Sequence, residues 1–169
     1  STIIDSLIAE AGTLSDVVNE FKTNTFQYLF VAIGYSRMEY RANVFKQFKS
    51  IIPFANIIHK SCIIDSSVKL GEGIFLFPGV ILDKGVQIGD NVLLNIGVAI
   101  AHDTIVADHC FLGPRVSIAG FTTLRSKCYV GTNATIIDNL NICSNVIIGA
   151  GSVTIKDILE KGVYVGIPS

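Results

Sequence analysis

Aliphatic residues recur every six positions along most of the chain. From Ile64 to Ile148, fifteen consecutive positions spaced by six are Leu, Ile or Val. A second series lies two residues earlier in each hexad, from Cys62 to Ser152, and is almost entirely small or β-branched. A six-residue period fits neither the 3.6-residue helix nor the heptad. Because apolar positions two residues apart share one face of a strand, the pattern predicts strands.

The residues between the apolar positions are typical of turns. Glycine recurs directly after the aliphatic position, at Gly71, Gly89, Gly113, Gly131 and Gly149. Gly, Asn and Asp are the residues that most readily adopt positive φ. Each hexad therefore predicts one short strand followed by a corner. Stacked coils of such hexads would bury a continuous aliphatic interior that no single coil could bury alone.

Residues 1–58 lack this period and predict helices and a strand. "LSDVVNEF" at 14–21 indicates a short helix with Ser15 as its N-cap. "QYLFVAIG" at 27–34 indicates a buried strand that ends in glycine. "SRMEYRANVFKQFKSI" at 36–51 indicates an amphipathic helix, whose extension Pro53 limits. Strand, glycine turn and helix form half of an α/β unit.

Composition narrows the classes of partner. Hydrophobic residues make up 50% of the 169 residues and charged residues only 16%, an excess that a repeat core or an oligomer interface would absorb. No apolar run approaches the roughly 18 residues of a membrane span. A net charge of −1 without a basic block argues against nucleic-acid binding. Four cysteines without a CxxC motif, and no signal peptide at the start, predict reduced thiols and a cytoplasmic protein.

The unbroken hexads over about residues 62–155 resemble the left-handed parallel β-helix acyltransferases. The resemblance implies triangular coils of three hexads, about 18 residues each. It also implies a left-handed crossover, against the usual rule for parallel strands. We therefore expect a mostly β fold, a left-handed parallel β-helix over 59–155. A partial α/β segment, 1–58, would precede it, and a tail that closes the helix and contacts coenzyme A (CoA), 156–169, would follow it.

"VAIGYSRMEYR", then "IIH" at 57–59, then the hexads are similar to the acyltransferases that modify amino sugars or sialic acid. Those proteins usually open with a complete small α/β domain, whose Gly-rich turn holds the nucleotide of a nucleotide-sugar. "GYS" at 34–36 is not such a fingerprint. Because Ser1 falls partway into that domain, we expect either a truncated chain or a different mode of acceptor binding. The closing segment "VIIGAGSVTIKDILEKGVYVGIPS" resembles the family's end that contacts the adenosine of CoA.

Two His-Asp pairs occur within the hexads, and the first is His102-Asp103. His102 follows the inward Ile100 by two residues, so it falls at a corner and faces outward. Steps of 18 from His102 reach Lys84 below and Gly120 above. Because stacked strands lie about 4.8 Å apart, the Gly120 amide can lie near whatever His102 touches. A glycine there lets a substrate approach the backbone closely.

The second pair is Asp108-His109, on another side of the coil. The neighbours of His109 in its column are Asn91 and Lys127, so no glycine lies directly one coil above or below it. We predict a structural role for His109, and the same for His59 at the junction with the N-terminal segment.

The resemblance assigns roles to the first pair. The family's catalytic His is followed by an acidic residue in a segment similar to "NIGVAIAHD", which implies His102 as general base and Asp103 as its orienting partner. A glycine one coil later implies that the Gly120 amide, in "SIAG", stabilises the oxyanion of the thioester carbonyl. Some members have a second His where this chain has Phe111, so that role is not carried over.

A column of small residues, Pro114, Thr132, Ala150 and Pro168, could hold a long thin ligand such as the pantetheine arm. We expect its thioester end near Gly120. The expected donor-binding residues are Gly120, Phe121, Thr132, Ala150, Lys156, Ile167 and Pro168.

These observations favour an acetyl-CoA-dependent N-acetyltransferase, with a nucleotide-linked amino sugar as acceptor, acting in surface polysaccharide or glycan synthesis. We expect a homotrimer without bound metal, nucleic acid or membrane insertion. One alternative is a sugar O-acetyltransferase, for example of sialic acid. Another is a non-catalytic trimeric scaffold. A metal site similar to that of the gamma-carbonic anhydrases needs several convergent histidines, whereas the hexads contain only His102 and His109.

Overall fold

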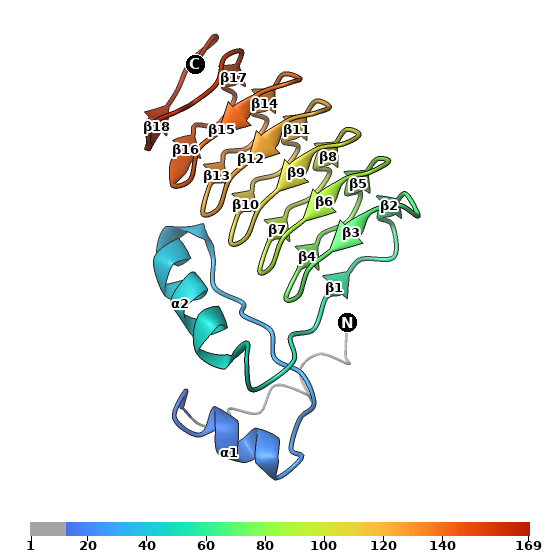
Figure 1. The fold of residues 1–169 in the computed structure, drawn as a ribbon, viewed down its shortest axis with the longest axis vertical. Coiled ribbons are helices and arrows are strands. Elements are labelled where there is room, and N and C mark those ends of the chain that lie inside the picture. The colour runs from blue at the N-terminus through green and yellow to red at the C-terminus, as the bar shows by residue number, and fades with distance from the viewer. Residues whose placement is uncertain (1–12) are drawn as a thin grey trace.

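The structure is a computed structural model that describes residues 13–169. The N-terminal part contains helix α1 (Val17–Lys22), a 3₁₀ turn η1 (Tyr35–Arg37) and helix α2 (Met38–Phe48). Within the described residues, eighteen short strands follow between residues 57 and 164 and stack into an elongated solenoid above the helices (Figure 1). Neither helix of residues 13–169 has the length and apolar character needed to cross a membrane.

The strands form three parallel sheets, which we name after their first strands. The β1 sheet contains β1 (Ile57–Ile58), β4 (Phe75–Leu76), β7 (Leu93–Leu94), β10 (Phe111–Leu112), β13 (Tyr129–Val130), β16 (Val146–Ile148) and β18 (Gly162–Tyr164). The β2 sheet contains β2 (Ile63–Ile64), β5 (Ile81–Leu82), β8 (Ala99–Ile100), β11 (Ser117–Ile118), β14 (Thr135–Ile136) and β17 (Val153–Thr154). The β3 sheet contains β3 (Lys69–Leu70), β6 (Gln87–Ile88), β9 (Ile105–Val106), β12 (Thr123–Leu124) and β15 (Asn141–Ile142).

From β1 to β14, each strand pairs in parallel with the strand three elements later, so successive coils lie in register. Phe111, for example, pairs with Leu93 on one side and with Tyr129 on the other, an interval of 18 residues. The result is a β-solenoid of about 6 turns. The predicted parallel β-helix of three hexads per coil is confirmed.

The two apolar series of the hexads form the core. From Leu76 to Ile148, the aliphatic position of every coil is at most 3% exposed. Cys110 and Cys128 belong to the other series and are completely buried as free thiols. Because the interior is continuous from coil to coil, its burial stabilises all coils together.

The corners need backbone in the left-handed region, and only some of them use glycine. Asp103, His109 and Phe121 have φ between 56° and 64°. Gly85 and Gly97 adopt φ of 72° and 67° at equivalent corner positions.

The N-terminal part differs from the prediction in two places. The N-cap of α1 is Asp16 rather than Ser15, and the Asp16 carboxylate accepts hydrogen bonds from Thr13 instead of capping the helix. The predicted strand at 27–34 is wrong, since only an isolated bridge between Leu29 and Phe54 forms there. The segment is apolar because it packs against its neighbours; Phe30, for instance, lies edge-on to Phe75, with ring centroids 5.4 Å apart.

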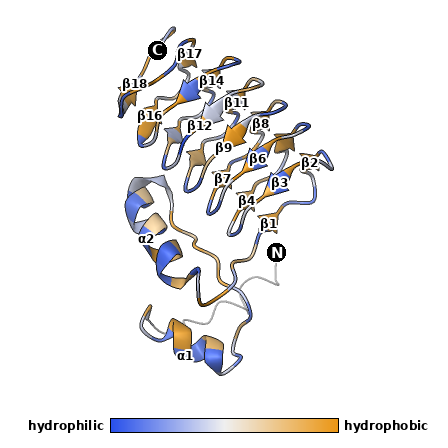
Figure 2. Cartoon of the chain, in the orientation of Figure 1, coloured by the Kyte–Doolittle hydropathy of each residue, from blue (hydrophilic) through white to orange (hydrophobic). Residues whose placement is uncertain are grey.

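Helix α2 is shorter than the predicted 36–51, because η1 replaces its first turn and Phe48 ends it. Its apolar side, which includes Val44, Phe45 and Phe48, is buried with Val31, Ile52 and Phe54. Hydrophilic and hydrophobic residues alternate around this helix (Figure 2).

Helix α2 contacts one corner of the solenoid through side chains along its length. The guanidinium of Arg41 donates to the carbonyl of Asn91. The ammonium of Lys127 forms an ion pair with Glu39 at 2.8 Å. The ring of Phe45 faces Gly73, where an added β-carbon would lie 2.8 Å from the ring. These contacts hold the helix against the solenoid.

The solenoid extends beyond the predicted limits of 59–155. At one end, β1 pairs with β4. At the other, β18 pairs with β16, but the interval falls from 18 to 16, since Ile148 pairs with Tyr164. The last coil is therefore two residues short. The tail closes it, with Val153 N–H donating to the carbonyl of Gly166 and Ser169 N–H to that of Val153.

Candidate active site

Three corners run along the solenoid, each a column of residues 18 apart. We name them by one residue. The His102 corner joins the β2 sheet to the β3 sheet, the His109 corner joins the β3 sheet to the β1 sheet, and the Thr132 corner joins the β1 sheet to the β2 sheet. The candidate catalytic residues lie at the His102 corner.

His102 and Asp103 form a hydrogen-bonded pair at the turn between β8 and β9. His102 Nδ1 lies 3.2 Å from Asp103 Oδ2, and both side chains are about half exposed, at 48% and 52%. The Asp103 N–H donates to the carbonyl of Lys84 at 2.9 Å, which fixes the turn to the coil below. If the carboxylate holds the imidazole proton on Nδ1, Nε2 is left without a proton and can accept one.

Gly120 lies directly against the His102 ring, as the 18-residue column predicts. A β-carbon added at Gly120 would lie between 2.8 and 3.2 Å from three ring atoms, so any other residue would displace the imidazole. The next residue, Phe121, donates its N–H to the carbonyl of His102 at 3.1 Å. The Gly120 N–H itself donates no hydrogen bond to any atom of residues 13–169, which leaves a backbone donor beside the imidazole.

Phe121 places an aromatic ring at the edge of this pair. Its centroid lies 4.9 Å from that of His102, with an interplanar angle of 83°. The ring is 57% exposed and its backbone φ is 57°. A bulky apolar residue in the left-handed region is uncommon and tends to mark a functional position.

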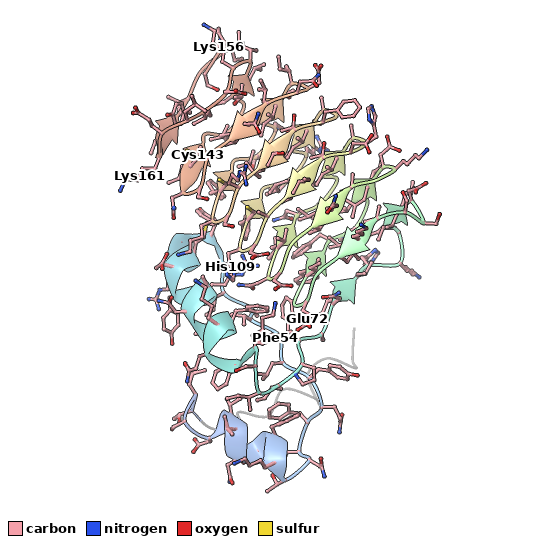
Figure 3. All side chains as sticks on the ribbon, in the orientation of Figure 1. Phe54, Glu72, His109, Cys143, Lys156 and Lys161 are labelled. Atoms are coloured by element: carbon pink, nitrogen blue, oxygen red, sulfur yellow. The ribbon has the colours of Figure 1, made fainter. Side chains whose placement is uncertain are left out.

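His109 occupies a different environment, at the corner that α2 covers (Figure 3). It is 6% exposed, and its Nδ1 lies 3.0 Å from the Asn91 amide nitrogen. Burial, together with nearby cations that include Lys46 and Arg41, lowers its pKa from 6.5 to about 4 despite the opposing charge of Asp108. His59 lies in the first coil, between β1 and β2, and its Nδ1 is 2.8 Å from the Ser61 hydroxyl. These contacts agree with structural roles for both.

The expected donor-binding residues do not share one column with Gly120. Thr132 and Ala150 lie exposed at the Thr132 corner, across the β2 sheet from the His102 corner. The short last coil also shifts the tail: Ile148 pairs with Tyr164, so the 18-residue interval that was expected to place Pro168 above Ala150 does not hold there. Lys156 and Ile167 are exposed in the closing segment.

A shallow groove on the β2 sheet borders the His102 corner, and the sequence analysis did not identify it. Its volume is about 650 Å³. Small outward residues, Ala99, Ser117 and Thr135, form its floor at successive coils. Their spacing of 18 was the signal available in the sequence. The groove is lined by residues 63–65, 81–83, 99–101, 117–119 and 135–138, which include those directly before His102 and Gly120.

The four cysteines lie away from the His102 corner. Within residues 13–169, no group of three or more His, Cys, Asp or Glu could hold a metal ion. Burial raises the pKa of the Cys110 thiol well above its usual value, so this thiol is a poor nucleophile.

The repeat and the parallel sheets define the class of fold: this chain folds as a parallel β-helix of hexapeptide repeats. The profile of the family "Bacterial transferase hexapeptide (six repeats)" matches residues 85–120, which include Gly85, His102 and Gly120. No curated protein sequence matches the chain.

Among particular proteins, the chain is similar to GDP-perosamine N-acetyltransferase from Caulobacter crescentus, solved with CoA and GDP-perosamine. The two are 28% identical with a TM-score of 0.86 over 91% of this chain and 72% of the other. Two of its structures carry a substitution of one histidine. The fold is also that of the acetyltransferase domain of PglB from Neisseria gonorrhoeae, at 20% identity and a TM-score of 0.80, with 88% and 74% of the two chains covered.

Proposed function

We propose that the protein transfers an acetyl group from acetyl-CoA to the amino group of a nucleotide-linked amino sugar. The observation that carries the proposal is the His102 ring, bonded to Asp103 at Nδ1 and lying against the Gly120 backbone. The similarity to an N-acetyltransferase solved with CoA and GDP-perosamine supports the choice of donor and acceptor.

The pair supplies what amide formation from a thioester requires. The acceptor nitrogen attacks the thioester carbonyl carbon while His102 Nε2 accepts the proton from that nitrogen. The carbonyl oxygen becomes an oxyanion, which the Gly120 N–H stabilises, an effect often worth about 3 kcal/mol. The intermediate then collapses, the C–S bond breaks, and the imidazolium returns its proton to the CoA thiolate. Asp103 stabilises the imidazolium formed between these steps.

For the donor, we propose that the pantetheine arm follows the Thr132 corner towards the tail, past Thr132 and Ala150. Because these residues are exposed, Ala150→Trp fills that path without disturbing the core, and we expect it to weaken acetyl-CoA binding at least tenfold in calorimetry. Gln87→Trp, at an exposed position on the β3 sheet, is the matched control. Unchanged affinity in a folded Ala150→Trp variant would contradict this path.

We propose that the protein is a homotrimer in which the apolar outer face of the β2 sheet is covered. Ile63 and Ile81 project outward from the β2 sheet and are 66% and 43% exposed in the single chain. A triangular prism with such faces buries them well against copies of itself.

Mass spectrometry after incubation with acetyl-CoA tests the reaction. The acceptors are GDP-, UDP- and dTDP-linked amino sugars, each paired with the same nucleotide sugar bearing a hydroxyl in place of the amine. We expect one acetyl group on an amino sugar and none on its hydroxyl partner. Acetylation of the hydroxyl partner would identify an O-acetyltransferase. Acetyl-CoA binding with no acetylated product would contradict the proposal.

A further inference from the structure

Gly85 lies one coil below Asp103 at the same corner, and its α-carbon faces the Asp103 carboxylate. A β-carbon added at Gly85 would lie 2.6 Å from Oδ1 and 3.4 Å from Cγ of Asp103. The backbone here is fixed, because the Asp103 N–H donates to the carbonyl of Lys84 and the Gly85 N–H donates to the Ser67 hydroxyl at 2.8 Å. Only a hydrogen atom fits in the space between Gly85 and the carboxylate.

The two oxygens of Asp103 therefore have different tasks. Oδ2 bonds to His102 Nδ1, whereas Oδ1 rests against Gly85. Because a carboxylate is planar and rigid, pushing Oδ1 away moves Oδ2 as well and breaks the bond to the imidazole. On the other side of the pair, Gly120 contacts the His102 ring. The pair is thus held between one glycine a coil below and another a coil above.

We propose that Gly85 is a positioning residue for acetyl transfer, acting through Asp103 to hold His102 in the tautomer with Nδ1 protonated and Nε2 free. This inference rests on the proposed function, in which Nε2 accepts the proton of the acceptor amine. Gly85 itself touches neither substrate nor the reacting atoms.

A matched glycine separates this role from backbone strain. Gly85 has φ of 72°, so alanine is strained there in any case. Gly79, at the Thr132 corner, has φ of 75°, but a β-carbon added there would lie 3.8 Å from its nearest neighbour, an ordinary contact. Alanine therefore brings the same strain to both positions and a clash to Gly85 alone.

The experiment compares Gly85→Ala with Gly79→Ala in the full chain. We expect both to lose similar thermal stability. Gly85→Ala should lower kcat about 10- to 100-fold, as the loss of an orienting partner does, with little change in KM for acetyl-CoA. Gly79→Ala should keep the wild-type kcat. In ¹⁵N spectra of the imidazole above neutral pH, without substrate, Gly85→Ala should move the His102 proton from Nδ1 towards Nε2.

A double variant tests whether Gly85 acts through Asp103. In an Asp103→Ala background no carboxylate remains to be displaced, so Gly85→Ala should cause no further loss of kcat. A further loss of the same size, or an unchanged tautomer in Gly85→Ala, would overturn the inference. If the alanine variants do not fold, Gly85→Asn and Gly79→Asn replace them, because Asn tolerates positive φ.

The tautomer measurement also keeps the inference separate from the proposed function. A wild-type protein without acetyltransferase activity would contradict the proposed function. A His102 proton on Nδ1 in the wild type that moves in Gly85→Ala but not in Gly79→Ala would still establish the positioning.

Discussion

At the level of single residues, His102 and His109 show how one repeat gives the same side chain two different environments. Both follow a strand and occupy a turn, seven positions apart in the chain. His102 is half exposed, with a carboxylate on one nitrogen and a glycine against its ring. His109 is buried beneath α2, with an amide on Nδ1 and the Phe45 ring 5.7 Å away. What covers the corner therefore decides which imidazole can exchange protons with a substrate.

Removing the proposed base should affect the chemical step and little else. We expect His102→Ala to lower turnover by about 100-fold or more while acetyl-CoA binding stays nearly intact, because a general base acts in the transition state. Steady-state kinetics and calorimetry on the same preparation measure the two quantities. His109→Asn, which suits the positive φ at that corner, is the control and should retain most activity. Equal losses in the two variants would contradict the assignment.

His109 should make stability depend on pH. Its folded-state pKa of about 4 lies below the unfolded value near 6.5, so the unfolded chain binds the extra proton between these values. Stability is therefore fully present above pH 6.5 and falls as the pH drops towards 4. Between pH 7 and pH 5 we expect wild type to lose about 2 kcal/mol more free energy of unfolding than His109→Asn, measured by urea titration. Parallel losses would show that other groups cause the effect.

At the level of elements, Phe45 is one of several side chains that hold α2 against the solenoid. Phe45 is 1% exposed and packs on Phe54 at 4.2 Å between ring centroids. Phe45→Ala leaves a cavity at this junction and should lower stability by about 3–5 kcal/mol. Hydrogen exchange should then speed up in α2 before it does so in β8 and β11. Tyr40→Ala, at a position of the same helix that is 49% exposed, should change stability by less than about 0.5 kcal/mol.

The elements also show which parts of the structure can be predicted from the sequence. Each hexad repeats the same information, so inward positions, corners and the contact of His102 with Gly120 follow from counting. The segment 27–34 carries no such redundancy. An apolar run is equally consistent with a strand and with a segment buried by packing, and Phe30 against Phe75 shows the second outcome.

The expected donor path shows where counting by hexads was applied incompletely and where it fails. Thr132 follows Gly120 by twelve residues, two hexads, so the same counting assigns the two residues to different corners. Gly85 was likewise available as the residue 18 before Asp103. The two-residue shortening of the last coil could not be predicted from the sequence, because no aliphatic position marks where the interval changes. Pro168 was therefore placed one coil above Ala150 by a period that had already ended.

At the level of the whole molecule, the proposed trimer would cover the outward isoleucines of the β2 sheet. We expect light scattering at micromolar concentration to give about three times the chain mass of 18.2 kDa. Ile63→Glu together with Ile81→Glu should reduce that mass, because both side chains lie exposed on the β2 face. Ile105→Glu, on the β3 sheet, tests whether the effect is confined to that face. A monomeric wild type would contradict the proposed trimer.

The shortened last coil bears on a hazard shared by all stacked sheets. A solenoid that ended in a full coil of 18 residues would present open strand edges in the register of its own first coil, a template on which further molecules could polymerise into fibres. The coil here tapers by two residues, and the tail folds back so that the final backbone groups bond to β17 and β16. Deleting residues 162–169 would uncover these edges. We therefore expect the tail to hinder end-to-end growth of fibres, so that its deletion gives high-mass species in light scattering.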